Sequence, residues 1–333
     1  MKHVSIEILQ KCPNNCLHCS SESGIKCNDY IIGLEKIKKI FDGLSKLKAE
    51  QVSISGGEPF LHKDLAEMVK YAKEKNFKIY IYTSGIMLDE NNKYISLAED
   101  IVKQLKEAGV DKLIFNLQSL KKDKYKEIMG TKEENLDLLK KSIKLSKKNE
   151  IYTELHFVPM KKNYEEIEEV IKFVEDENLD RVSFLGLIPH GRAKANIEKL
   201  YLDKDINSKV KELLASYEAD KVRVGIPLQM KKQKCICNAV SEKLYIKFDG
   251  TIHGCEAFKY YPLFDKEGKI ICPDNINDND DIEYIYNNSK YLKAALMEKE
   301  LILKKDIYEN CPIQEECREK GIRIFYDNKK KDI

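Results

Sequence analysis

Short β-rich runs alternate with longer stretches in which apolar residues recur at helical spacing, from the amino terminus to about residue 190. The predicted strands are Val4–Leu9, Gln51–Ser55, Phe77–Thr83, Lys112–Leu117, Ile151–Val158 and Arg181–Leu187. The predicted helices fall at about 33–48, 62–75, 95–108, 133–149 and 163–178, the last with Asn163 as its N-cap. Strands that alternate with helices in this way predict parallel βαβ units.

The predicted strands also alternate between polar and apolar side chains. One face carries Glu7, Ser53, Ser55, Tyr80, Tyr82, Asn116, Glu154 and His156, and the other carries Ile6, Ile54, Ile81, Phe115 and Phe157. Parallel strands covered on both faces are usually apolar throughout, so the polar face indicates a lumen that holds ligands. The pattern predicts an α/β fold, an open (β/α)6 partial barrel of TIM type, with its chemistry at the carboxyl ends of the strands.

The alternation of predicted strands and helices stops after Arg192. This suggests three parts: a barrel over 1–192, a bridging helical segment over 193–234 and a small domain over 235–333. In the third part, a strand from Lys243, the turn Phe248-Asp249-Gly250-Thr251 and a second strand predict a hairpin that ends at Cys255. Residues 273–281 are rich in Asn and Asp and predict a loop, and the lysines at 329–331 predict a solvated tail.

Composition narrows the class of protein. The 333 residues carry 58 basic and 56 acidic side chains. The net charge is therefore too small to attract nucleic acid or an anionic membrane to the protein as a whole. No apolar run approaches the roughly 18 residues of a membrane helix, and the amino terminus lacks a signal peptide, so we expect a cytoplasmic protein. Arginine is rare: only Arg181, Arg192, Arg223, Arg318 and Arg323 occur.

The ten cysteines form two groups that are separated by about two hundred residues, which suggests two metal sites. Cys12, Cys16 and Cys19 follow the first strand with the spacing CxxxCxxC, so one short loop presents three thiolates. Structural zinc needs a fourth ligand, such as His18 or Cys27, whereas an iron-sulfur cluster held by three cysteines keeps one iron open. Spacing alone leaves both alternatives in place, with unliganded thiols as a third.

The second predicted strand ends in Ser55-Gly56-Gly57-Glu58-Pro59. Two glycines and a proline after a strand usually mark only a turn. Combined with CxxxCxxC after the first strand, however, this motif resembles the radical S-adenosylmethionine (SAM) superfamily, whose barrel carries both motifs at these strand ends.

The resemblance implies that Cys12, Cys16 and Cys19 bind a [4Fe-4S] cluster whose fourth iron is chelated by SAM, and that 56–59 position the methionyl amine. Further contacts to SAM are expected from Ser84, Asn116, Ser119 and His156, with a helix cap as the alternative role of each serine. Arg192, in a P-x-G-R-A-like element, is expected to grip a carboxylate of SAM or substrate, or else to cap the barrel rim. His18 is expected over the adenine or cluster, or simply packed or facing solvent.

The second cysteine group resembles the SPASM and twitch domains of this superfamily. Cys237, Gly250 and Cys255 match the opening C-x(9 to 15)-G-x4-C, and Cys311 and Cys317 supply C-x5-C, but Tyr308 and Gly321 stand where further cysteines would be. The resemblance therefore implies one auxiliary [4Fe-4S] cluster on Cys237, Cys255, Cys311 and Cys317, with Cys235 as a substitute ligand and zinc at the last two still open. Cys27 and Cys272 are expected to be structural, or one of them to donate hydrogen to a product radical.

The expected function is reductive cleavage of SAM to a 5′-deoxyadenosyl radical that abstracts hydrogen from a ribosomally made peptide, giving a crosslink, a thioether or an epimerised centre. An electron donor such as flavodoxin or ferredoxin is implied. Only eleven residues precede Cys12, so we expect no leader-binding domain there. The alternatives are a small-molecule enzyme of the molybdopterin-precursor or haem-modifying type, and a non-catalytic zinc or iron-sulfur protein.

Overall fold

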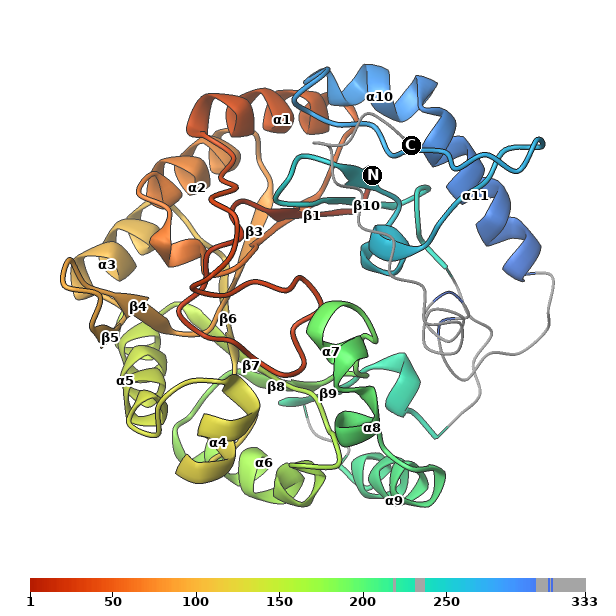
Figure 1. The fold of residues 1–333 in the computed structure, drawn as a ribbon. Coiled ribbons are helices and arrows are strands. Elements are labelled where there is room, and N and C mark those ends of the chain that lie inside the picture. Colours follow the sequence, from red (N-terminus) through yellow and green to blue (C-terminus); the bar gives the residue numbers. More distant parts are fainter. Residues whose placement is uncertain (218–219, 231–236, 304–310, 312, 314–333) are drawn as a thin grey trace.

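The computed structural model describes residues 1–217, 220–230, 237–303, 311 and 313. Its centre is a curved nine-stranded sheet with the order β11-β10-β1-β2-β3-β6-β7-β8-β9, ringed by helices (Figure 1). All neighbouring strands of this sheet are parallel except β10 and β11. The strands are β1 (His3–Glu7), β2 (Gln51–Ser55), β3 (Lys78–Thr83), β6 (Lys112–Asn116), β7 (Tyr152–Phe157), β8 (Arg181–Phe184), β9 (Val222–Val224), β10 (Lys243–Ile246) and β11 (Ile252–His253).

Helices cover the outside of the sheet. They are α1 (Leu34–Lys46), α2 (Leu65–Glu74), α3 (Glu99–Glu107), α4 (Lys122–Met129), α5 (Asn135–Lys148), α6 (Ile167–Asp176), α7 (Gly191–Ala195), α8 (Ile197–Leu200), α9 (Lys204–Ala215), α10 (Ile282–Asn288) and α11 (Lys290–Leu303). Short 3-10 turns lie at η1 (Pro59–Leu61), η2 (Tyr164–Glu166), η3 (Ile226–Leu228) and η4 (Glu256–Tyr260). Within the described residues, no helix combines the length and the apolar character that crossing a bilayer requires.

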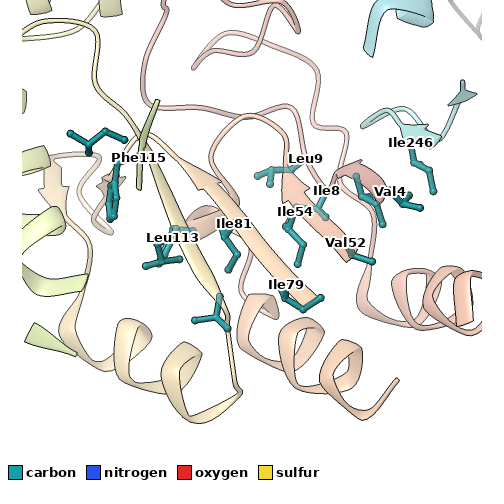
Figure 2. Packing of buried hydrophobic residues seen from close by; sticks show 14 of the residues in the cluster. Val4, Ile8, Leu9, Val52, Ile54, Ile79, Ile81, Leu113, Phe115 and Ile246 are labelled. Carbon is teal, nitrogen blue, oxygen red and sulfur yellow. The ribbon is translucent and has the colours of Figure 1, made fainter. Parts of the chain in front are cut away.

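The apolar face of each strand packs against the helices. Val52, Ile54, Ile81 and Phe115 are completely buried in one continuous core (Figure 2). The polar face turns inward, where the rings of Tyr82 and His156 meet with centroids 5.2 Å apart although their strands are not neighbours. The predicted fold class, a partial barrel with a polar lumen, is therefore confirmed.

The structure adds elements that the sequence pattern did not indicate. A separate hairpin consists of β4 (Ile86–Leu88) and β5 (Tyr94–Ser96), and β5 includes the first residues of the helix predicted over 95–108. Helix α4, which follows β6, is a second addition. The bridging segment contains α8, α9 and also β9, which pairs with β8. Strands of three residues are too short for periodicity to detect.

Asn163 occupies the N-cap position of η2, as predicted, but its side chain bonds elsewhere. Its side chain makes no capping hydrogen bond to the following turn. It accepts a hydrogen bond from the amide of Met160 at 2.7 Å and donates to the carbonyl of Gln118 at 2.8 Å. Asn163 therefore joins the loops after β6 and β7, a tertiary role that local sequence does not reveal.

The predicted hairpin after Lys243 is present as β10 and β11, and Gly250 in its turn has φ +89°. Its first strand also pairs in parallel with β1, so the main sheet extends into the carboxyl-terminal part of the chain. The division into 1–192, 193–234 and 235–333 stays a prediction. The expected tail at 329–331 lies outside the described residues.

Candidate functional site

The segment between β1 and α1, residues 8–33, contains the first three cysteines and is called the cysteine loop here. Cys12 and Cys16 are buried and Cys19 is partly exposed. Burial, with the nearby Cys16 and Glu58, raises the pKa of Cys12 well above its usual value, and burial with Cys19 raises the pKa of Cys16 to about 12. Thiols crowded in this way are poorly suited to remain free thiolates, and a bound metal centre would offset the cost of deprotonating them.

Single-ion binding has a different geometry from cluster binding. Within the described residues, no group of three His, Cys, Asp or Glu side chains is arranged to hold a single metal ion. A single zinc ion binds all of its cysteine ligands itself, with Zn–S distances of about 2.3 Å. A four-iron cluster instead spreads its cysteines over separate irons, so the two kinds of site place different demands on the thiols.

Two glycines seat the end of β2 against the cysteine loop. The amide of Gly57 donates a hydrogen bond to the carbonyl of Leu9 at 2.7 Å. The amide of Glu58 donates one to the carbonyl of Lys11 at 2.9 Å. A Cβ atom on Gly57 would lie 2.0 Å from the Lys11 oxygen, and one on Gly56, where φ is +140°, 2.4 Å from the Leu9 oxygen. The two motifs therefore form one unit that tolerates no side chain at either glycine.

Glu58 is fully buried, and the turn after β3 holds its carboxylate. Thr83 Oγ1 donates to Oε1 at 2.7 Å, and the amide and hydroxyl of Ser84 donate to Oε2 at 2.7 and 2.5 Å. Burial raises the pKa of Glu58, while these hydrogen bonds oppose the shift. Ser84 thus fixes the orientation of Glu58, a role that sequence reasoning did not assign to it. Pro59 begins η1 directly after Glu58 and is buried.

Several buried polar atoms of the cysteine loop have no hydrogen-bond partner within the described residues. They are Oε1 of Gln10, both side-chain amide atoms of Asn14, Nδ1 of His18 and Oγ of Ser23. The other ring nitrogen of His18 lies 3.4 Å from Nδ2 of Asn116, and burial with the nearby Arg192 lowers the pKa of His18 to about 4. Unpaired buried polar groups are costly, so this loop is suited to a polar cofactor that would satisfy them.

Arg192 is engaged by the backbone of the cysteine loop, and its contact with a carboxylate stays a prediction. Its Nε donates to the carbonyl of Cys16 at 2.9 Å and its Nη2 to that of Ser23 at 2.5 Å. The amide of Ala193 donates to the carbonyl of Cys19 at 3.4 Å. The guanidinium therefore holds the backbone of the cysteine loop in shape, which is closer to the rim-capping alternative than to a carboxylate clamp.

Two more expected contacts are engaged by protein groups. Ser119 is completely buried, and its hydroxyl bonds to the carboxylate of Glu166 at 2.8 Å. His156 lies in the lumen, 3.4 Å from the carboxylate of Glu154, and burial lowers its pKa. The contact of each with a cofactor stays a prediction.

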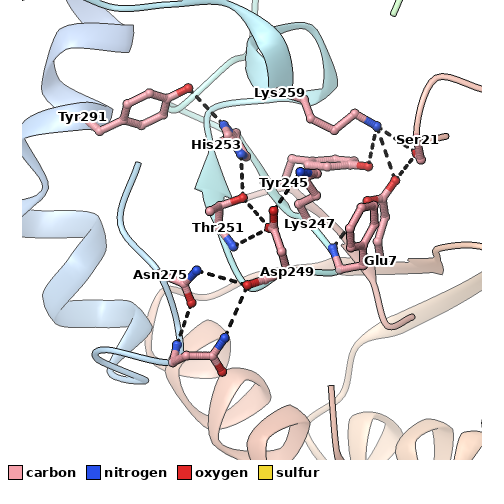
Figure 3. Close-up of polar contacts among 12 residues, drawn as sticks. Glu7, Ser21, Tyr245, Lys247, Asp249, Thr251, His253, Lys259, Asn275 and Tyr291 are labelled. Atoms are coloured by element: carbon pink, nitrogen blue, oxygen red, sulfur yellow. Dashed lines mark hydrogen bonds and ion pairs between the residues drawn. The ribbon is translucent and has the colours of Figure 1, made fainter. Parts of the chain in front are cut away.

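A buried lysine that sequence reasoning missed joins the carboxyl-terminal part of the chain to the cysteine loop. Nζ of Lys259, in η4, lies 3.3 Å from the carboxylate of Glu7, 2.8 Å from the hydroxyl of Ser21 and 3.1 Å from that of Tyr245 (Figure 3). Ser21 also bonds to Glu7. Glu7 on the polar face was the only signal in the sequence, because its partner is 252 residues away.

Replacing Lys259 with Met is expected to destabilise the fold by roughly 3–5 kcal/mol, because Glu7 would be left as a buried charge without its cation. The double variant Glu7→Gln/Lys259→Met should recover much of the loss. Chemical denaturation measures both, with Lys39→Met as a control at an exposed ion pair. Equal effects of the two lysine substitutions would contradict this account.

The second cysteine group is described in part. Cys237, Cys255 and Cys311 are partly buried and pack against the main core, while Cys235 and Cys317 lie outside the described residues. Burial, with nearby Glu256 and Cys311, raises the pKa of Cys255 to about 12. Cys272 is exposed, and the thiol of Cys27 donates to the carbonyl of Gly24. Cys311 thus lies near enough to Cys255 to affect its pKa.

Comparison with known proteins bears directly on this arrangement. The sequence pattern of the radical SAM superfamily matches residues 6–174, half of the chain and all of the motifs around the cysteine loop. The chain belongs to the radical SAM superfamily. It is therefore a radical SAM enzyme, and a SAM-binding [4Fe-4S] cluster and SAM are implied by its family.

Two curated relatives of this radical SAM enzyme are small-molecule enzymes by name. A probable GTP 3′,8-cyclase of Methanocaldococcus jannaschii is 27% identical over 237 residues, which is 70% of this chain and 72% of that protein. The Fe-coproporphyrin III synthase of Methanosarcina barkeri is 25% identical over 192 residues, 57% of this chain and 45% of that protein.

A solved structure resembles more of the fold. Streptococcus suis SuiB bound to S-adenosylmethionine has a TM-score of 0.66 and 17% identity, and the match covers 88% of this chain and 67% of SuiB. SuiB has also been solved with its precursor peptide SuiA. This likeness concerns the fold, including the carboxyl-terminal part that the superfamily match does not reach.

Proposed function

We propose that this radical SAM enzyme abstracts hydrogen from a residue of a ribosomally synthesised peptide, leading to a crosslink, a thioether or an epimerised centre. The observation that carries the proposal is the seating of Gly56 and Gly57 on the cysteine loop, which joins the three thiols and the Glu58 carboxylate in one rigid unit. When bound, the cluster supplies the electron that cleaves SAM to methionine and a 5′-deoxyadenosyl radical.

The protein's own residues hold that unit in place. Cys12, Cys16 and Cys19 would ligate the cluster, and Glu58, fixed by Thr83 and Ser84, would accept hydrogen bonds from the methionyl ammonium group. Arg192 keeps the cysteine loop in one shape. Such a site works by positioning and by excluding water, because an adenosyl radical attacks most C–H bonds within reach.

A peptide substrate is supported by the fold of SuiB, a protein solved with a precursor peptide, and by a polar lumen at the edge of an open sheet. The sequence relatives favour a second candidate, a small-molecule reaction like those in their names. The two are separated by incubating the reduced enzyme with SAM and either peptides encoded nearby or GTP, and measuring 5′-deoxyadenosine. Peptide-dependent formation, with a mass change or solvent deuterium in the peptide, supports the proposal, and GTP-dependent formation contradicts it.

We also propose an auxiliary [4Fe-4S] cluster on Cys237, Cys255, Cys311 and Cys317, and reduction by flavodoxin or ferredoxin. The Cys255→Ala variant is expected to keep SAM cleavage and to lose product formation, because the auxiliary site lies apart from the cysteine loop in the sequence. Its iron content should fall from about eight to about four per chain, as two four-iron clusters would predict. Cys272→Ala, at an exposed cysteine, is the control. Unchanged iron in Cys255→Ala would contradict the auxiliary site.

A further inference from the structure

A row of polar side chains crosses the barrel wall at one level. The register pairs Asn116 of β6 with His156 of β7, His156 with Ser183 of β8, and Ser183 with Arg223 of β9. Residues paired in register point to the same face, here the lumen. The row begins beside His18 of the cysteine loop, which Asn116 contacts. It ends on β9, the edge strand that follows β6, β7 and β8 in the sheet (Figure 1).

Arg223 ends this row, and Arg181 lies one level below it, paired in register with Glu154. Arg223 is exposed, with Nη1 3.4 Å from the hydroxyl of Ser183. Arg181 lies two residues before Ser183 on the same face of β8, and its buried Nε has no hydrogen-bond partner within the described residues. Arg181 and Arg223 are therefore strand neighbours of Ser183 on the face that turns to the lumen.

These arginines differ from the other cations of the lumen. Lys112 is paired with Glu154 at 2.6 Å, Lys243 with Glu256 at 2.7 Å, and Lys259 with Glu7 at 3.3 Å. In the part of the chain that the structure describes, every ion pair uses a lysine or His156 as its cation, and none uses an arginine. The positive charges of these two guanidinium groups are thus not neutralised by an ion pair within the described residues, near the edge of the sheet at β9.

We infer that Arg181 and Arg223 form a carboxylate-binding site at the edge of the barrel, and that it holds an acidic side chain or the carboxyl terminus of the substrate. The inference rests on the proposed function, since it takes the substrate to be a peptide. Guanidinium groups recognise carboxylates through paired hydrogen bonds, whereas the Ser183 hydroxyl already donates to Glu154 and accepts from Arg223.

The neighbouring Glu154 favours a singly charged ligand. Its carboxylate accepts a hydrogen bond from Ser183 at 2.5 Å, and Arg223 also touches Ser183. A triphosphate placed on the arginines would bring several negative charges close to Glu154, whereas a carboxylate brings one. The local charge therefore fits a peptide acid better than a nucleotide.

The row also sets a distance. Four neighbouring strands span roughly 14 Å at about 4.8 Å per step. An extended peptide covers about 3.4 Å per residue, so roughly four residues separate the carboxylate from the residue at the cysteine-loop end. The attacked residue is therefore expected about four positions from an acidic residue or from the carboxyl terminus.

The scarcity of arginine allows a direct test. Selective ¹⁵N labelling of arginine in the full chain gives only five side-chain Nε–H signals in an NMR spectrum, assigned with Arg181→Lys and Arg223→Lys. The probes are N-acetylglutamate α-amide for a side-chain carboxylate, N-acetylalanine for a terminal one, N-acetylglutamine amide as the neutral control, and inorganic phosphate.

One or both carboxylate probes should shift the Arg181 and Arg223 signals saturably, and the neutral probe should not. Arg223→Gln should weaken binding by about tenfold or more and Arg223→Lys by less, while Lys221→Gln, two residues earlier and bonded to Asn178, leaves it unchanged. Absence of a shift, equal shifts of all five signals, or binding of phosphate alone would overturn the inference.

The experiments distinguish failure of the proposed function from failure of the inferred carboxylate site. Carboxylate binding by both arginines in an enzyme that modifies no peptide would contradict the proposed function and leave the carboxylate site standing. A peptide that is modified at the same rate when its acidic side chains and its carboxyl terminus are all amidated would overturn the inference alone.

Discussion

Replacing Cys12, Cys16 and Cys19 together with alanine is expected to abolish 5′-deoxyadenosine formation and to remove about four irons per chain. The reason is that these three thiols lie together in the cysteine loop, beside Glu58. Iron analysis and product quantification under anaerobic conditions measure both effects.

Cys27→Ala is the matched control, since Cys27 belongs to the same loop and, within the described residues, its thiol donates to the carbonyl of Gly24. It should keep both the iron and the SAM cleavage of the unsubstituted enzyme. SAM cleavage that persists in the triple variant would refute the assignment of the cluster ligands, and loss of cleavage in Cys27→Ala would show that the loop needs a fourth thiol.

Gly57→Ala is expected to have the second-largest effect. The added Cβ would lie 2.0 Å from one backbone oxygen and 2.4 Å from another, and backbone atoms cannot move aside as a side chain could. We expect a loss of roughly 3 kcal/mol in folding free energy. The expected loss in SAM affinity is at least about tenfold, since the Glu58 amide would no longer reach the Lys11 carbonyl.

Gly33→Ala serves as its control, because nothing lies within 4 Å of a Cβ at that glycine, where φ is −65°. Its free energy of unfolding should change by less than about 1 kcal/mol. Thermal unfolding and SAM titration report on the two variants. Normal SAM affinity in a folded Gly57→Ala protein would mean that the close seating of the two motifs is not required.

The sequence predicted the barrel well because its signals are local and repeated. Strands such as Gln51–Ser55 alternate clearly between apolar Val52 and Ile54 and polar Ser53. The two motifs were also predictable, since each follows a strand directly and the carboxyl ends of parallel strands meet at one edge.

What the sequence did not reveal depends on contacts between distant residues. Lys259 reaches Glu7 across 252 positions, and Arg192 reaches the Cys16 carbonyl across 176, so neither partner could be read from spacing. Asn163 looked like a helix cap because its neighbours fit the pattern, yet its amide joins two loops. Strand β9 was too short to carry a period of its own.

The central claim is that the cysteine loop binds a cluster with one iron free for SAM. The most direct measurement is the electron paramagnetic resonance spectrum of the reduced Cys255→Ala variant, which lacks the proposed auxiliary cluster, before and after SAM is added. The account predicts one four-iron signal whose shape changes on binding of SAM, with magnetic coupling to the labelled methionyl nitrogen. A spectrum that SAM leaves unchanged, in protein that carries the full cluster, would contradict it.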